Sequence, residues 1–168
     1  MWFMACHEAG HAVVAAEVGI PFRPEGMIVE IRGDRAHGRV HTKVLDRIAL
    51  RRLEHLDESV LRYGRRELCM KLAGLLAQEE IHAQPGPQFS GNKQADLDRA
   101  RELAMLLSRG DEDGAREMLN AARERAADII RRRRKEVRKL ARLALKNGRV
   151  APDEIARVLG LELDVRDD

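Results

Sequence analysis

Aromatic residues are scarce in this chain of 168 residues, because Phe, Trp and Tyr together make up 3% of it. Hydrophobic residues still make up 44%, so a core must be built mainly from Leu, Ala, Val and Ile. No apolar run reaches the roughly 20 residues that cross a bilayer, and the start, Met1 to Cys6, is too short for a signal peptide. We therefore expect one cytoplasmic domain without a transmembrane segment.

Cysteine and net charge are low as well. The two cysteines, Cys6 and Cys69, lack the spacing of a metal or redox motif, which favours reduced thiols. Lys and Arg total 31 against 28 acidic residues, so the net charge of +3 does not by itself require a nucleic-acid partner. The phosphate-binding pattern G-x-x-x-x-G-K-[ST] is absent.

Hydrophobic periodicity predicts a mainly α fold with one small β hairpin near the N-terminus. Strand patterns predict the hairpin from residues 27–31 and 38–44. Residues 84–91 are predicted to form a loop, and residues 164–168 to be frayed. Helices are predicted at 2–18, in two segments of 45–82, and at 94–107, 113–146 and 151–160. We expect one domain, with a site in 1–110 and C-terminal helices in 111–163.

His7-Glu8-Ala9-Gly10-His11 matches the pattern H-E-x-x-H within the first predicted helix. Residues four apart lie on one face of a helix, so both imidazoles can bind one zinc ion. Glu8 lies beside them, where it can accept a proton from a zinc-activated water and return it to a leaving amine. Gly10 inside the helix costs about 1 kcal/mol relative to alanine, which indicates that something approaches the backbone closely.

The motif does not identify the third zinc ligand. Chance gives the pattern in roughly two of a hundred shuffled sequences of this composition, and a catalytic zinc needs a third protein ligand and an open position. Glu17 stands where an extended form of the motif has a histidine, and it lies on another helical face. Seven residues elsewhere are candidates: His37, His41, Glu79, Glu80, His82, Asp96 and Asp98.

Residues 5–15 closely resemble the zinc helix of the FtsH-type peptidases, the M41 family of membrane-bound, ATP-dependent metalloproteases. Residues 28–42, 72–81 and 89–100 resemble three further motifs of that family, in the same order. The tail from residue 121 to 159 looks like the family's closing helices. The resemblance covers nearly the whole chain and implies a single helical peptidase domain, without the family's ATPase and membrane segments.

The resemblance implies that Asp96 joins His7 and His11 in holding one zinc ion per chain. It also implies an edge strand, to which an extended peptide binds through main-chain hydrogen bonds; this strand comprises Gly38, Arg39, Val40, His41 and Thr42. Gly38 would let another backbone come close. The hairpin could instead serve only to cap the core. Because His37 and His41 lie four apart in a β region and not on a helix, we interpret them as surface residues near the cleft rather than as ligands.

The chain departs from the family pattern beside the expected site. Leu75 replaces an arginine, Gln78 the first of two glutamates, and Ala95 an asparagine. Glu79 keeps the position of the second glutamate, where we expect it to help orient the ligands. Loss of such orienting side chains lowers metal affinity or activity about 10- to 100-fold.

The sequence therefore predicts a zinc endopeptidase that hydrolyses unfolded or flexible polypeptides. A folded substrate would need a separate ATPase partner, and by resemblance a homo-oligomer, a hexamer, is plausible. One alternative is a catalytically weak or inactive interaction module of the same fold. Another is a basic helical nucleic-acid binder built on Arg131 to Lys135. We interpret that run as a solvated helix face and expect no nucleic-acid partner.

Overall fold

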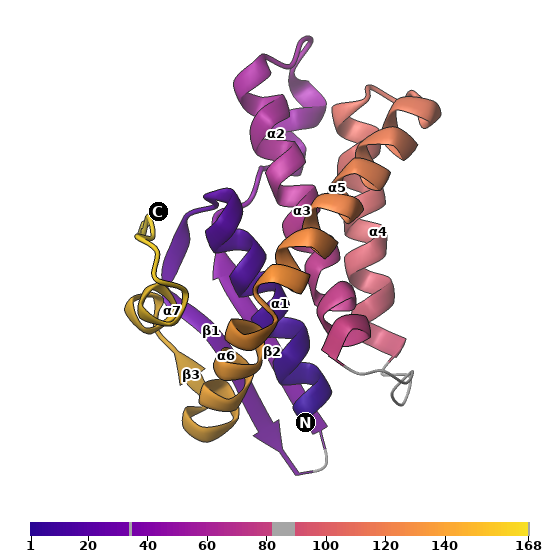
Figure 1. The fold of residues 1–168 in the computed structure, drawn as a ribbon. Helices are drawn as coiled ribbons and strands as arrows, with labels where there is room; N and C mark the ends of the chain where they lie inside the picture. Colours follow the sequence, from indigo (N-terminus) through magenta and orange to yellow (C-terminus); the bar gives the residue numbers. More distant parts are fainter. Residues whose placement is uncertain (34, 82–89, 168) are drawn as a thin grey trace.

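The computed structural model describes the chain except for residues 34, 82–89 and 168. Within the described residues there are seven helices and a three-stranded antiparallel sheet (Figure 1). The predicted mainly α fold with a small β region near the N-terminus is thus confirmed. No helix in the described part of the chain has the length and apolar character needed to cross a membrane.

The helices and strands have the following bounds. The helices are α1 (Trp2–Val18), α2 (Arg47–Arg52), α3 (Glu58–Ile81), α4 (Ser90–Leu107), α5 (Glu112–Arg132), α6 (Arg134–Asn147) and α7 (Pro152–Leu159). The strands are β1 (Phe22–Arg32), β2 (Arg35–Thr42) and β3 (Arg149–Val150).

Helix α1 is the central element of the molecule. In Figure 1 it lies between α3, α4 and α5 on one side and the sheet with α6 and α7 on the other. The close approach expected at Gly10 is present, since a Cβ there would lie 2.5 Å from Ala77 Cβ and 2.7 Å from Ala73 O of α3. The helix ends where Gly19 adopts the left-handed conformation, with φ of 71°.

The sheet has the strand order β2-β1-β3, so β2 is an edge strand. Met27 pairs with Val40 and Val29 with Gly38, whereas the register shifts between Phe22 and Met27. The predicted hairpin is therefore present, but the prediction missed β3. A strand of two residues has no periodicity to detect, and β3 forms because Met27 and Ile28 offer it a partner.

The prediction of one helix over residues 113–146 is wrong. The chain breaks at Arg133, with φ of −101° and ψ of 20°, so that α5 ends and α6 begins there. No Gly or Pro marks this position in the sequence. The Arg133 guanidinium instead turns inward, donating to Glu17 Oε1 at 2.6 Å and to the Leu159 carbonyl at 3.2 Å.

Two smaller predictions also need correction. Helix α4 begins at Ser90 rather than near Gln94, so the end of the predicted loop is helical; residues 84–89 lie outside the described part. The tail is not frayed at residues 164–166, because the Phe22 amide donates to the Asp164 carbonyl at 2.8 Å and the Arg166 amide to the Phe22 carbonyl at 2.9 Å. The C-terminal segment therefore pairs in parallel with the start of β1.

Candidate metal centre

Helix α1 places His7 and His11 on one face, one turn apart. Their rings are 4.6 Å apart between centroids and stand edge to face at 82°. The two Nε2 atoms are 3.0 Å apart. Both residues are buried, with 2% of His7 and 9% of His11 exposed, so neither ring is simply a surface side chain.

Asp96 of α4 completes this pair. Its Oδ2 lies 2.9 Å from His7 Nε2 and 3.2 Å from His11 Nε2. Within the described residues, His7, His11 and Asp96 are the group of His, Cys, Asp and Glu side chains whose ligand atoms converge on one point. The structure thus brings together the three ligands that the resemblance implied.

The other candidates for the third ligand are elsewhere or outside the described residues. Glu79 lies within 3.9 Å of Arg123, Glu80 within 3.8 Å of Arg134, and Asp98 within 3.7 Å of Arg101. Two histidines lie on the β2 strand, where His37 is exposed and His41 lines the cleft described below. His82 lies outside the described residues.

The three side chains fit a zinc ion. Ligands at about 2.0–2.1 Å in a tetrahedron lie about 3.3 Å from one another, and the three separations here are 2.9, 3.0 and 3.2 Å. His11 Nδ1 lies 2.6 Å from the Met70 carbonyl, which only accepts hydrogen bonds, so Nδ1 carries the proton. His11 Nε2 is therefore the nitrogen that can bind a metal when the ring is neutral.

The protonation of these groups reflects the same geometry. Burial tends to raise the pKa of Asp96, but hydrogen bonds from His11 and His7 outweigh it and hold the pKa well below its usual range. Burial lowers the pKa of His7. Burial also opposes protonation of His11, but Asp96 and Glu8 reverse this and raise its pKa. Asp96 is therefore ionised, and its negative charge favours a positive charge beside it at the two rings.

Glu8 is the buried acid of this site, with 4% of the residue exposed. Burial raises its pKa to about 7, and the Asp96 charge adds to the rise. A carboxyl group that titrates near neutral pH can both accept and release a proton at working pH. The space beside Gly38, which the sequence assigned to a substrate backbone, is filled by the Glu8 side chain, because a Cβ on Gly38 would lie 2.7 Å from Glu8 Oε1.

Gly74 of α3 is a functional position that the sequence analysis missed. A Cβ at this residue would lie 2.5 Å from His7 Cε1 and 2.6 Å from His11 Nε2. The imidazoles therefore occupy the volume that any other side chain would take. Gly74 lies in the stretch that resembles the family's helix motif, but its role depends on how α3 crosses α1, which the sequence alone does not give.

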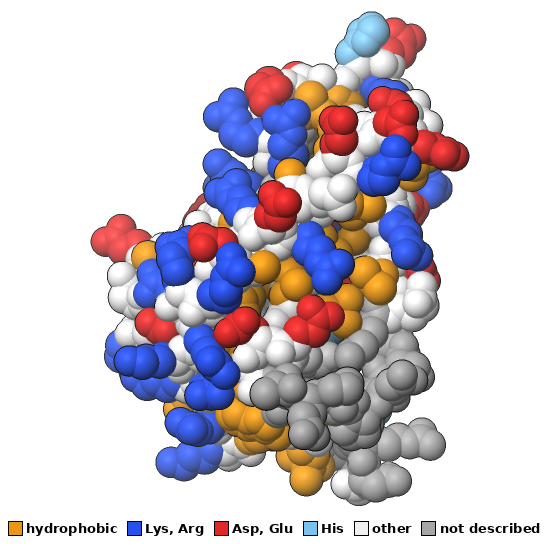
Figure 2. All heavy atoms as spheres, turned by 45° about the vertical axis from the view of Figure 1, so that its right-hand side comes forward, with side chains coloured by type: hydrophobic (Ala, Val, Ile, Leu, Met, Phe, Trp, Pro, Cys, Tyr) orange, Lys and Arg blue, Asp and Glu red, His pale blue; other side chains and the backbone are white. Residues whose placement is uncertain are grey.

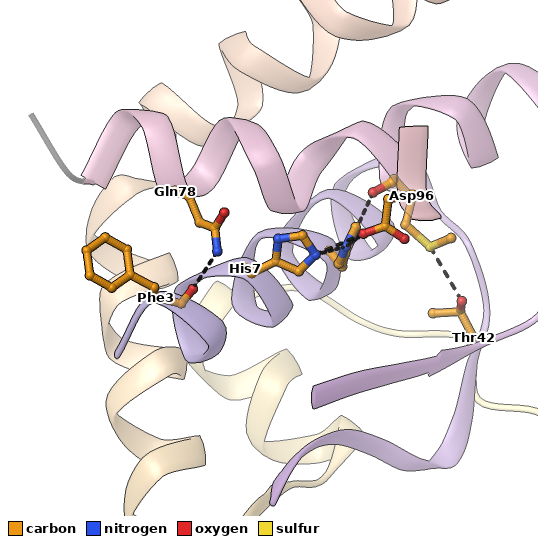
Figure 3. A network of polar contacts seen from close by, with 7 residues as sticks. Phe3, His7, Thr42, Gln78 and Asp96 are labelled. Carbon is orange, nitrogen blue, oxygen red and sulfur yellow. Dashed lines mark hydrogen bonds and ion pairs between the residues drawn. The ribbon is translucent and has the colours of Figure 1, made fainter. Parts of the chain in front are cut away.

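Gln78, rather than Glu79, lies next to His7 on α3. Figure 3 shows its amide between Phe3 and His7, and its Nε2 donates to the Phe3 carbonyl at 3.0 Å. His7 Nδ1 and Gln78 Oε1 are buried, and among the described residues neither has a hydrogen-bond partner. Glu79 has 61% of its side chain exposed, so the expectation that it orients the ligands is corrected.

A cleft of about 910 Å³ opens at His7, His11 and Asp96. One wall is β2, whose residues Gly38 to Thr42 all line the cleft. Thr42 Oγ1 donates to Met70 Sδ at 3.4 Å, which joins the end of this strand to α3 (Figure 3). Ala95 lines the opposite side next to Asp96. The edge strand expected to bind peptide therefore borders the same space as Glu8.

The arginine run beyond the cleft is paired with acidic side chains. Arg132 Nε donates to Asp128 at 3.0 Å, Arg134 lies 3.8 Å from Glu80, and Arg131 lies 4.0 Å from Asp128. Arg133 is the inward residue at the break between α5 and α6. Over the face turned forward in Figure 2, Lys and Arg side chains are interspersed with Asp and Glu. This surface lacks the one-sided positive charge of a nucleic-acid interface.

No protein-family model matches this chain. No curated protein matches it either.

Proposed function

We propose that this protein is a zinc-dependent endopeptidase. The observation that carries the proposal is the convergence of three ligand atoms, from His7, His11 and Asp96, beside the buried carboxyl group of Glu8. Two imidazoles and a carboxylate are a typical ligand set for a catalytic zinc, which keeps a fourth position open. The cleft gives that position access to a substrate.

The chemistry is the addition of water to a peptide carbonyl. A zinc ion bound by the three residues supplies a Lewis acid that polarises the carbonyl and makes water more acidic. Glu8 accepts one proton from the water as the C–O bond forms. It then gives this proton to the amide nitrogen as the C–N bond breaks, so that Glu8 ends in its starting state.

The expected substrate is an extended polypeptide. An edge strand such as β2 can pair with a peptide backbone, and this favours unfolded or flexible segments over folded ones. A folded protein would have to be unfolded first, by a separate ATPase. The paired arginines of residues 131–134 argue against the nucleic-acid alternative.

A catalytically weak module is the second candidate. Gln78 beside His7 favours it, because a neutral amide there, whose Nε2 is bound to the Phe3 carbonyl, orients the ring less firmly than the carboxylate that the resemblance implies at this position. This candidate predicts that zinc binds but that hydrolysis is slow or absent.

The test is casein hydrolysis by purified protein whose metal content has been measured. We expect about one zinc per chain, activity that a chelator removes and zinc restores, and loss of activity in Glu8→Gln with zinc retained. Glu117→Gln, the same substitution on the exposed face of α5, is the control and should leave activity unchanged. Zinc without hydrolysis would support the weak module, and no bound metal would refute both candidates.

A further inference from the structure

Apart from the site residues Glu8 and Asp96, the cleft wall carries more arginines than acidic side chains. Arg23, Arg39 and Arg99 all line the cleft and are exposed. None of the three forms an ion pair with a described carboxylate, whereas Arg47 and Lys71, also in the lining, both contact the buried Glu67. Three arginines therefore line the substrate space without an ion-pair partner among the described residues.

Arg23 reaches this wall because of the irregularity in β1. Phe22 pairs with Thr42, but the next pair in register is Met27 with Val40. The residues between bulge out of the ladder, and Arg149 holds the bulge by donating to the carbonyl groups of Pro24 at 2.6 Å and Glu25 at 3.0 Å. Bulges of this kind commonly re-aim a side chain next to an active site.

The pKa of His41 is also affected by the charges of this wall. Burial is the largest cause of its lowered pKa. Glu25 comes next and opposes this, while Arg39, Arg23 and Arg149 each add to the lowering. His41 is therefore neutral near pH 7, and the charge of this wall comes from the arginines.

The opposite side of the cleft adds Arg99. It follows Asp96 by three residues on α4, so both side chains lie on one face of that helix. Of the remaining carboxylates of the described lining, Glu25 is the one that can offset part of this positive charge. Glu102 is bound by Arg51 at 2.5 Å, which leaves Glu25 as the acidic lining residue outside the metal site without an ion pair among the described residues.

We propose that the cleft selects polypeptide segments with Asp or Glu side chains close to the bond that is cut, and that Arg23, Arg39 and Arg99 bind those carboxylates. This inference rests on the proposed function, since it names the substrate class of that site. Peptide fits better than nucleic acid because an edge strand for main-chain pairing borders the cleft, while its described lining contains no Phe, Tyr or Trp on which bases could stack.

The experiment measures binding of fluorescent peptides to the zinc-loaded Glu8→Gln protein at low salt, so that hydrolysis is not needed. Three peptides share one Ala/Leu/Gly sequence and carry Glu, Gln or Lys on both sides of the centre. The acidic peptide should bind most tightly and the basic one least. Each lost arginine–carboxylate contact should weaken acidic-peptide binding about two- to fivefold, and added salt should reduce the difference.

Arg23→Gln and Arg39→Gln, alone and combined, test the wall in the same assay. Arg125→Gln, an exposed arginine of α5 outside the cleft lining, is the control matched in net charge to each single variant. The combined variant should lose most of the preference for Glu over Gln, and Arg125→Gln should keep it.

Equal binding of the three peptides, no binding of any of them, or a preference that survives the combined variant would overturn the inference. The inference would also be overturned if a single-stranded oligonucleotide with the same number of negative charges displaced the acidic peptide. The wall would then bind polyanions in general rather than acidic polypeptides. If wild-type protein hydrolyses casein in any of these cases, the proposed peptidase function stands and only the substrate class is wrong.

Discussion

At the scale of single residues, the site depends on the absence of side chains as much as on the side chains present. Gly10 allows α3 to approach α1, Gly74 leaves room for both imidazoles, and Gly38 leaves room for Glu8. Gly38 and Gly74 are in contact with side chains that the proposed chemistry uses, and Gly10 is in contact with α3, the helix that carries Gly74. A methyl group at any of them must displace part of the site.

Gly74→Ala gives the sharpest test at this scale. The new methyl group would lie 2.5 Å from His7 Cε1, so the rings must move away from the ligand geometry. Alanine also favours a helix over glycine by about 1 kcal/mol, which offsets part of the strain on folding. We expect zinc affinity to fall about tenfold or more, measured by competition with a chromophoric chelator.

Gly64→Ala is the matched control. Its methyl group would also be crowded, at 2.5 Å from Leu107 Cδ1, but this contact lies in the apolar core between α3 and α4. We expect Gly64→Ala to change the free energy of unfolding and to leave zinc affinity as in the wild type. Equal loss of zinc affinity in both variants would show that the helix packing as a whole, not the space at Gly74, sets the metal site.

At the scale of elements, the break between α5 and α6 depends on one partly buried side chain, that of Arg133. Arg133 joins the break to α1 through Glu17 and to α7 through the Leu159 carbonyl. The side chains of Arg133 and Glu17 are 25% and 15% exposed, so the pair is better shielded from water than the other arginines of the run. This contact fixes the direction in which α6 leaves α5.

Arg133→Ala should lower the free energy of unfolding by about 1–3 kcal/mol, because the partly buried Glu17 carboxylate is left without its partner. Arg132→Ala should cost no more than about 0.5 kcal/mol, since its pair with Asp128 is exposed and lies within one helix. Urea unfolding of both variants measures the difference. Equal effects of the two substitutions would contradict a special role for Arg133.

At the scale of the whole molecule, the candidate metal centre joins two parts of the chain. His7 and His11 belong to the central helix, while Asp96 belongs to α4, and His7 and Asp96 are separated by 89 residues in the sequence. The cleft lies where these helices meet β2. A bound ion would therefore act as a cross-link as well as a reagent.

Zinc should accordingly stabilise the folded protein against heat. A ligand at a hundred times its dissociation constant adds about 2.7 kcal/mol when it binds only the folded state. We expect zinc to raise the midpoint of thermal unfolding and a chelator to reverse the shift. Asp96→Asn should remove most of the shift, whereas Asp98→Asn, an exposed neighbour on α4, should keep it; an unchanged shift in Asp96→Asn would exclude Asp96 as a ligand.

The local sequence pattern was sufficient to predict several features of this protein. The helix of residues 2–18, its termination at Gly19 and the alignment of His7 with His11 all follow from a repeat of 3.6 residues and from glycine at a helix end. The break between α2 and α3 was predicted as well, because polar residues interrupt the apolar pattern there. In each case the determining interactions lie within a few residues of one another.

The features that depend on contacts between distant parts of the chain could be found only from the tertiary structure. From spacing alone Asp96 was one of seven candidates, and only the crossing of α1, α3 and α4 brings its carboxylate to 2.9 Å from His7. The same crossing puts Gln78 rather than Glu79 beside His7, and it gives Gly74 its role. Strand β3 and the inward turn of Arg133 likewise depend on partners more than a hundred residues away. Residue periodicity reports which face of an element is apolar, but not which element will cover that face, because packing is chosen by the shapes of both partners.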